Sequence, residues 1–186
     1  MEVALRAQVA KVDEVLSLLH TLEDPHTEFC LLRWCLSLPK VMHLLRSPPT
    51  IGHWEILEEF DHLTMQVLTD LLGAGLTDLQ VRQAMLPATL GGMGLQAATD
   101  HVTSAFVASI SATRALTRAM LGTKEDTPSP PICQSILDTL STNFGEIEPV
   151  TEASLEGFTQ RQLNVKVDSA ISNFSLTSRS MLASAR

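Results

Sequence analysis

The chain has 186 residues, enough for one ordinary domain with a core, and 45% of them are hydrophobic, which excludes an intrinsically disordered protein. Only 4% are aromatic and none is Tyr, so the core must be mainly aliphatic, a composition that favours helices over a β-sandwich or barrel. The formal charge of −8 lacks the basic excess that is usual in a free-standing nucleic-acid-binding protein.

The cysteine count and the N-terminal residues bear on the compartment. The chain has three cysteines, at 30, 35 and 133. This low and odd count argues against a disulfide framework. Residues 1–15 carry charges every few positions, unlike a signal peptide, and no run of 18 apolar residues predicts a membrane span. We therefore expect an intracellular protein, nuclear or cytoplasmic, that is not secreted and does not enter a membrane.

The first 72 residues predict successive helices. Residues 2–20 repeat apolar side chains at helical spacing, and Asp24 with Pro25 then forms a good helix start. That second helix reaches the break before Pro39, and a short helix over 40–46 ends at two prolines. The clearest and longest helix covers 53–72 and ends at "GAG".

Three glycines mark a corner between the next two helices. Thr77 caps a short helix that ends at Pro87, and Gly91, Gly92 and Gly94 follow. They lack the preceding strand of a dinucleotide fingerprint and the Gly-Lys-Ser/Thr of a P-loop. We interpret them as a structural turn, in which Gly91→Val harms folding. The alternative is a phosphate held by free N–H groups at the start of the following helix.

The remaining residues complete an all-α prediction. A helix rich in Ala, Ser and Val covers 96–121 and is expected to be buried on most sides. The stretch "TKEDTPSPP", residues 123–131, is a predicted linker between a helical domain over 1–122 and a C-terminal helical segment over 132–186. The fold class is thus a helical bundle of about six to eight helices.

No residue pattern predicts catalysis by this chain. His26, Cys30 and Cys35 lack the second ligand pair of a structural zinc site, so they are interpreted as a surface histidine and buried thiols. Glu58, Asp61 and their neighbours Glu59 and His62 are spread around one helix and are interpreted as a solvated face. We expect no metal and no cofactor.

Basic residues lie at intervals along the apolar segment "LLRWCLSLPKVMHLLR". Arg33, Lys40 and Arg46 interrupt its leucines, with His43 beside them. Such residues either snorkel from an apolar surface to water or contact phosphate groups. The pattern alone leaves both interpretations open.

Several stretches in order resemble one known family. They are "DPHTEFCLLRWCLSLPKVMHLLRSPP", "FDHLTMQVLTDLL" and "QAMLPATLGGMGLQAATDHVTSAFVASI". The chain resembles the region just after the reverse-transcriptase palm of non-LTR (LINE-type) retrotransposons of animals. The shared pattern is Leu-Leu-Arg-x-Cys, Leu-Leu-Arg before prolines, an Asp-bearing helix, an LP…GGxGL corner and an Ala/Ser-rich helix. The tail from residue 159 resembles downstream helices of that family and stops partway through a further motif. The resemblance covers most of the chain.

The resemblance implies a fragment without polymerase activity of its own. A reverse transcriptase needs paired palm aspartates for two-metal chemistry, and this chain has no Asp-Asp. The fragment would be a helical thumb and the helices after it, gripping an RNA/DNA template–primer within the intact polymerase. The implied phosphate contacts, expected to line one groove, are Arg33, Lys40, Arg46, Arg114 and Arg118.

Two functional hypotheses remain open. In the first, the thumb-like chain binds nucleic acid weakly or not at all when isolated, because its charge is −8. Apolar faces that once packed on a palm would then promote self-association. In the second, the chain is an all-helical protein–protein interaction or scaffold module with no nucleic-acid role.

Overall fold

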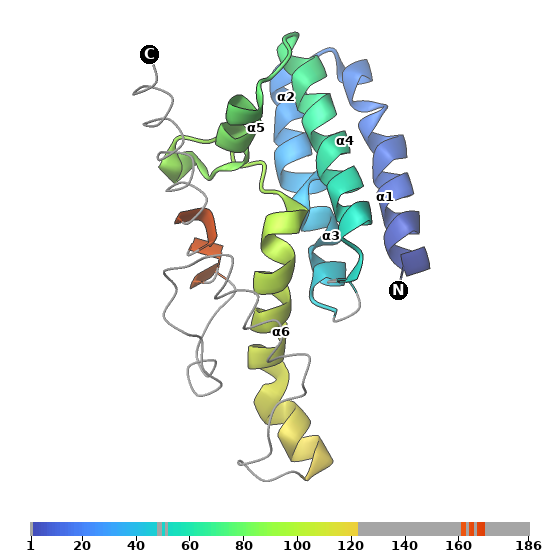
Figure 1. Cartoon of the computed structure of the whole chain (residues 1–186). Coiled ribbons are helices and arrows are strands. Elements are labelled where there is room, and N and C mark those ends of the chain that lie inside the picture. Colours follow the sequence, from blue (N-terminus) through green and yellow to red (C-terminus); the bar gives the residue numbers. More distant parts are fainter. Residues whose placement is uncertain are drawn as a thin grey trace.

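The chain folds into an all-α bundle (Figure 1). The computed structural model describes residues 2–47, 50, 52–122 and 161–169, the last without 163 and 166. Within these ranges there are α-helices and no strand, as predicted. The helices are α1 (Glu2–Leu16), α2 (Pro25–Leu31), α3 (Leu38–Leu45), α4 (Trp54–Leu72), α5 (Asp78–Met85) and α6 (Ala98–Leu121), with single 3₁₀ turns at Leu19–Leu22 and Ala88–Leu90.

Local capping signals begin and end several helices. The Asp24 carboxylate accepts a hydrogen bond from the backbone N–H of His26 at 3.3 Å, at the start of α2. Thr77 and Gln80 form a reciprocal capping box at the start of α5. Gly73 closes α4 with a left-handed φ of 63°. Each device supplies partners to backbone groups that the helix itself leaves unpaired.

The join between α2 and α3 differs from the predicted break at Pro39. α2 continues into a π-helical turn, Leu32–Leu36, and the chain breaks at Ser37. α3 then begins at Leu38, with Pro39 inside its first turn. Proline is tolerated there because the first N–H groups of a helix have no intrahelical partner.

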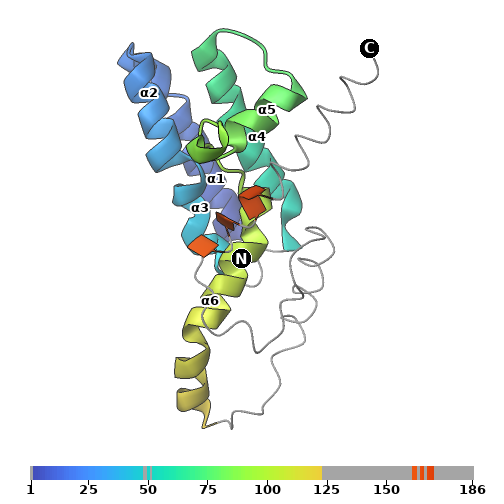
Figure 2. The same ribbon diagram turned by 90° about the vertical axis from the view of Figure 1, so that its left-hand side faces the viewer.

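The core lies where α1, α3, α4 and the first half of α6 meet (Figures 1 and 2). Aliphatic side chains fill it, and burying each large one contributes about 1.5–3 kcal/mol. The largest fully buried apolar residues are Leu5, Val12, Leu32, Val41, Leu45, Leu57, Phe60, Leu68, Leu95, Val102 and Val167.

The small-residue helix is buried over only half its length, contrary to prediction. Its buried residues all lie between Ala98 and Ala108, where α6 packs on α3 and α4. Farther along, Leu116 is 64% exposed and Met120 is 78% exposed. Geometry gives the reason: α6 is about 36 Å long and α3 only about 12 Å, so α6 extends past its neighbours (Figure 1).

The glycine corner, residues 86–97, folds back over the C-terminal end of α5. The N–H of Gly94 donates to the Leu86 carbonyl at 2.8 Å, and that of Gly92 donates to the Pro87 carbonyl at 3.0 Å. Gly91 and Gly94 each have a φ of 78°, which strains any other residue. The N–H of Met93 donates to the Ala84 carbonyl at 3.1 Å and so pairs a carbonyl that α5 leaves free at its end.

Within the corner, Gly92 is the position with least space, rather than Gly91. A Cβ atom at Gly92 would lie 1.9 Å from the carbonyl oxygen of Leu86, whereas one at Gly91 would meet only the Gln83 side chain, at 3.4 Å. Backbone atoms cannot move aside as a flexible side chain can. Gly91 therefore contributes its positive φ, and Gly92 contributes close backbone approach.

Gly92→Ala is expected to lower the free energy of unfolding by more than about 3 kcal/mol, because the added methyl group meets backbone atoms of Leu86 and Gln83 at the end of α5. The matched control is Gly75→Ala, where nothing lies within 4 Å of the added atom. That change should stay within about 0.5 kcal/mol of the wild-type value. Urea unfolding followed by circular dichroism measures both, and equal midpoints for the two variants would contradict the close-approach role.

Candidate nucleic-acid interface

A cleft of about 590 Å³ lies between α3, the glycine corner and the C-terminal helical residues 161–169. Two arginines line it: Arg46 at the end of α3, and Arg161 from the C-terminal residues. Apolar walls come from Met42 and Leu90. The three segments lie far apart in the sequence, yet the C-terminal residues, coloured orange-red, lie beside α6 and the corner in both views (Figures 1 and 2).

Buried polar contacts hold the C-terminal residues against α6. The hydroxyl of Ser104 donates to the Asn164 side-chain oxygen at 3.0 Å. His101 Nε2 lies 3.5 Å from a carboxylate oxygen of Asp168, and these two side chains are only 1% and 8% exposed. Among the described residues, Nδ1 of His101 is the buried side-chain atom without a hydrogen-bond partner.

The same carboxylate also joins the glycine corner to the C-terminal residues. The side-chain amide of Gln96 donates to Asp168 at 3.2 Å. Asn164 and Asp168 belong to the C-terminal segment of the predicted domain division, and these bonds join them to residues of the predicted 1–122 domain. The predicted linker over 123–131 and most of the 132–186 segment lie outside the described residues.

Arg33 lies against the corner and is not part of the cleft lining. Its guanidinium stacks on the ring of Trp34, 4.5 Å from the ring centroid. A Cβ atom at Gly94 would lie 2.6 Å from Arg33 Nη2, so the absence of a side chain at Gly94 makes room for the guanidinium. This arrangement gives Arg33 a packing role beside the corner, supported by a cation–π contact.

The other predicted phosphate contacts lie on two helices. Lys40 is exposed on α3, and Arg114 and Arg118 are partly buried on the distal half of α6. None of these three lines the cleft. Of the five cations expected to share one groove, the structure places Arg46 in the cleft, and Arg161 joins it there.

The N-terminus of α6 already holds an anion that belongs to the chain. Asp61 on α4 accepts hydrogen bonds from the backbone N–H of Ala98 at 2.7 Å and of Thr99 at 3.0 Å. The Thr99 hydroxyl donates to the same carboxylate at 2.7 Å. The phosphate alternative for this helix start is therefore wrong, because the N–H groups it requires bind Asp61.

Asp61 also corrects the interpretation of its helix as a solvated face. The residue is 9% exposed, and burial raises the pKa of its carboxyl to about 6, although hydrogen bonds from Thr99 and Ala98 oppose that rise. Burial likewise raises the pKa of Asp100, and the nearby His101 offsets part of the effect. Unlike Asp61, Glu58 and Glu59 on the same helix are exposed.

The expected buried thiols are not buried. Cys30 is half-buried, with its sulfur 3.8 Å from His26 Nε2, and Cys35 is exposed. In the π-helical turn, Leu32 and Leu36 take the core-facing positions, which turns Cys35 outward. Within the described ranges, no group of three His, Cys, Asp or Glu residues could hold a metal ion.

Three residues important to this region were not predicted: Asp61, His101 and Arg161. Asp61 had a weak signal, since it occupies a position that helical spacing assigns to the apolar face, beside Phe60. His101 also had a weak sequence signal, because it is a titratable residue near the start of a helix of small and apolar side chains. Arg161 had no local signal, because its place depends on contacts with residues about 60 positions away.

No described helix is long and apolar enough to cross a membrane. No protein-family model matches the chain, and comparisons with curated proteins and with solved structures gave no significant match. The resemblance to retrotransposon reverse transcriptases therefore stays a prediction from the sequence.

The free energy of unfolding is expected to fall as the pH rises through about 6, where folded Asp61 loses its proton. Its ordinary pKa is 3.8, so between 3.8 and about 6 the folded chain keeps a proton that the unfolded chain has released. The resulting stabilisation is complete below the lower value and lost above the higher one. A shift of about two pKa units corresponds to about 3 kcal/mol.

Urea unfolding of the wild type and of Asp61→Asn between about pH 4 and pH 7 measures this effect. The amide keeps one acceptor oxygen but does not titrate, so the variant should lack this component of the pH dependence. Glu58→Gln, an exposed change on the same helix, should retain it. Parallel curves for the wild type and Asp61→Asn would contradict the assignment.

Proposed function

We propose that the chain is the thumb-like helical part of a LINE-type retrotransposon reverse transcriptase. It would contact the sugar–phosphate backbone of a template–primer within the intact polymerase, in the nucleus or cytoplasm, and would have no catalytic activity alone. The order of the sequence elements supports the family. The observation that carries the nucleic-acid role is the cleft that places Arg46 and Arg161 in one concave surface.

The chemistry of this cleft suits phosphate better than bases. Guanidinium groups donate several hydrogen bonds in a plane and pair well with phosphate oxygens. The carboxylate of Asp168 also lines the cleft, but it accepts a hydrogen bond from Gln96 and faces His101, so it is engaged with the corner and α6. Backbone contacts of this kind would read the shape of a heteroduplex rather than its sequence.

The net charge of −8 limits the affinity of the isolated chain. Long-range repulsion from the acidic surface opposes approach of a polyanion, while the two cleft arginines attract it locally. Binding should therefore be weak and should fall steeply with salt, because cation–phosphate contacts release counterions. In an intact polymerase, the palm would supply most of the contacts with the template–primer.

Fluorescence anisotropy with a labelled RNA–DNA hybrid at low salt tests the cleft. The wild-type chain should bind with a dissociation constant no tighter than about 1 µM. Arg46→Gln should weaken binding and reduce the slope of log affinity against log salt by about 1, because one phosphate contact is lost. Arg161→Gln should act in the same way.

Lys11→Gln provides the matched control, because it removes one positive charge from the exposed face of α1 and leaves the cleft unchanged. It should leave the salt slope at its wild-type value. Equal effects of Lys11→Gln and Arg46→Gln on binding would contradict a role for the cleft. Sub-micromolar binding of the hybrid by the wild-type chain would contradict the proposal that the isolated thumb binds nucleic acid only weakly.

A second candidate function rests on the distal half of α6. Leu116, Met120 and Leu121 are 64%, 78% and 70% exposed, and the first two lie one helical turn apart. Exposed apolar side chains that gather on one helix are typical of surfaces that pack against another protein. This observation favours a protein–protein interaction or scaffold module, and it also gives a site for self-association.

Analytical ultracentrifugation should show concentration-dependent association of the wild type. A variant with Leu116→Gln and Met120→Gln should sediment as a monomer, because the apolar area that drives association is removed. Val3→Gln on α1, where the valine is 82% exposed, should associate like the wild type. A wild type that is monomeric at every concentration would contradict self-association. Association combined with no binding to the hybrid would favour the second function.

A further inference from the structure

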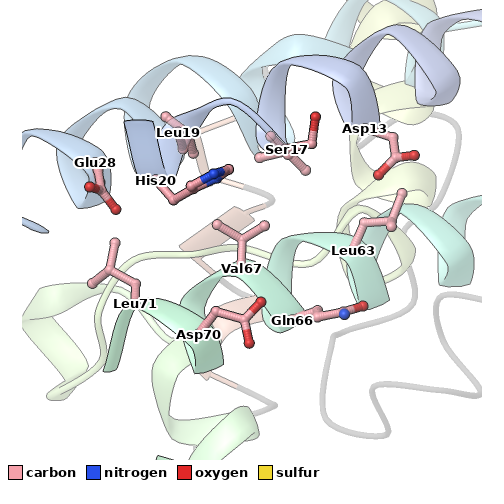
Figure 3. A pocket seen from close by; sticks show the side chains of 11 residues that line it. Asp13, Ser17, Leu19, His20, Glu28, Leu63, Gln66, Val67, Asp70 and Leu71 are labelled. Atoms are coloured by element: carbon pink, nitrogen blue, oxygen red, sulfur yellow. The ribbon is translucent and has the colours of Figure 1, made fainter. Parts of the chain in front are cut away.

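A second pocket, of about 290 Å³, lies between α4 and the segment that runs from α1 into α2 (Figure 3). It shares no lining residue with the arginine cleft. Its apolar surface includes Leu63, Val67 and Leu71, which follow one another at four-residue intervals along α4 and so form a stripe on one face of that helix.

Carboxylates surround this stripe. Asp13 comes from α1, Glu28 from α2 and Asp70 from α4, and no Lys or Arg is among the residues that line the pocket. His20 is the one basic side chain in the lining. The pocket is thus acidic on its rim and apolar along its floor.

Glu28 is the unusual member of this group. The residue is only 9% exposed, and no described residue donates a hydrogen bond to its carboxylate or forms an ion pair with it. In Figure 3 its carboxyl group projects from α2 into the space above Leu71. These oxygens face the pocket, so they can accept hydrogen bonds from a cation placed there.

The arrangement of the three carboxylates selects the kind of cation. They do not converge on a point, since no described group of three acidic, His or Cys residues could hold a metal ion. Figure 3 shows Asp13 and Glu28 toward opposite ends of the pocket, with Asp70 and Val67 between them. The matching ligand is elongated and carries positive charges separated by apolar segments.

We propose that this pocket binds a linear aliphatic polyamine, with its ammonium groups at Glu28, Asp70 and Asp13 and its methylene groups along the Leu63–Val67–Leu71 stripe. At about 30 Å³ for a water-sized group, the pocket holds on the order of ten non-hydrogen atoms, the size of a short triamine. This site is independent of the function proposed above and uses different residues.

Isothermal titration calorimetry of the full chain with spermidine, a triamine, tests the proposal. Spermidine should bind one site, and butylamine, which has a single ammonium group, should bind at least about tenfold more weakly because it cannot reach a second carboxylate. Magnesium chloride at equal ionic strength should not displace spermidine. Binding of butylamine as tight as that of spermidine, or full displacement by magnesium, would overturn the proposal.

Two variants locate the site. Glu28→Gln should weaken spermidine binding by at least about tenfold, because it removes the most buried carboxylate of the pocket. Asp70→Asn, an exposed change on the rim, should also weaken binding and serves as a second readout if Glu28→Gln is poorly folded. The control, Glu58→Gln, removes one negative charge from an exposed position of α4 outside the pocket.

Glu58→Gln should bind spermidine like the wild type. Equal weakening by Glu58→Gln and by the pocket variants would mean that polyamines only respond to the overall acidity of the chain, and the pocket would be excluded. Tighter, Glu28-dependent binding of a short oligolysine than of spermidine would also overturn the proposal, because the occupant would then be a basic peptide segment.

Discussion

The hydrogen-bonded carboxylate of Asp61 at the start of α6 connects the two halves of the structure. α4 carries Asp61 in the core, and the backbone N–H groups of Ala98 and Thr99 fix the helix that follows the glycine corner. Once α6 is placed, His101 and Ser104 face the C-terminal residues that carry Arg161. The composition of the arginine cleft therefore depends on a helix cap that begins two residues after Gln96, which lines the cleft.

Charge is distributed unequally over this acidic chain. The arginine cleft and the carboxylate pocket are lined by different helices, so two concave surfaces with opposite electrostatic character coexist at a net charge of −8. Average charge predicts how the molecule repels a polyanion at long range, but the local field in a concave surface is set by the few side chains that line it. Either surface can thus attract a ligand that the whole molecule would not.

Sequence patterns predicted the features that depend on neighbours in the chain. Asp24 and Thr77 cap their helices because the partner groups lie within three residues. Asp61 was misread because its partners lie 37 and 38 residues away, and nothing local distinguishes a buried acceptor from a solvated carboxylate. The burial of α6 was overestimated for a similar reason, since it depends on the lengths of the helices that α6 packs against.

The bond between residues 61 and 98 closes a loop that contains α5 and the glycine corner. Of the eight residues in α5, only Ala84 is buried, so this helix contributes little to the core. We therefore expect the amide hydrogens of α5 to exchange with solvent sooner than those of α4 and α6. One wall of the arginine cleft, at Pro87 and Leu90, would then be compliant, while the frame that holds Arg46 stays rigid.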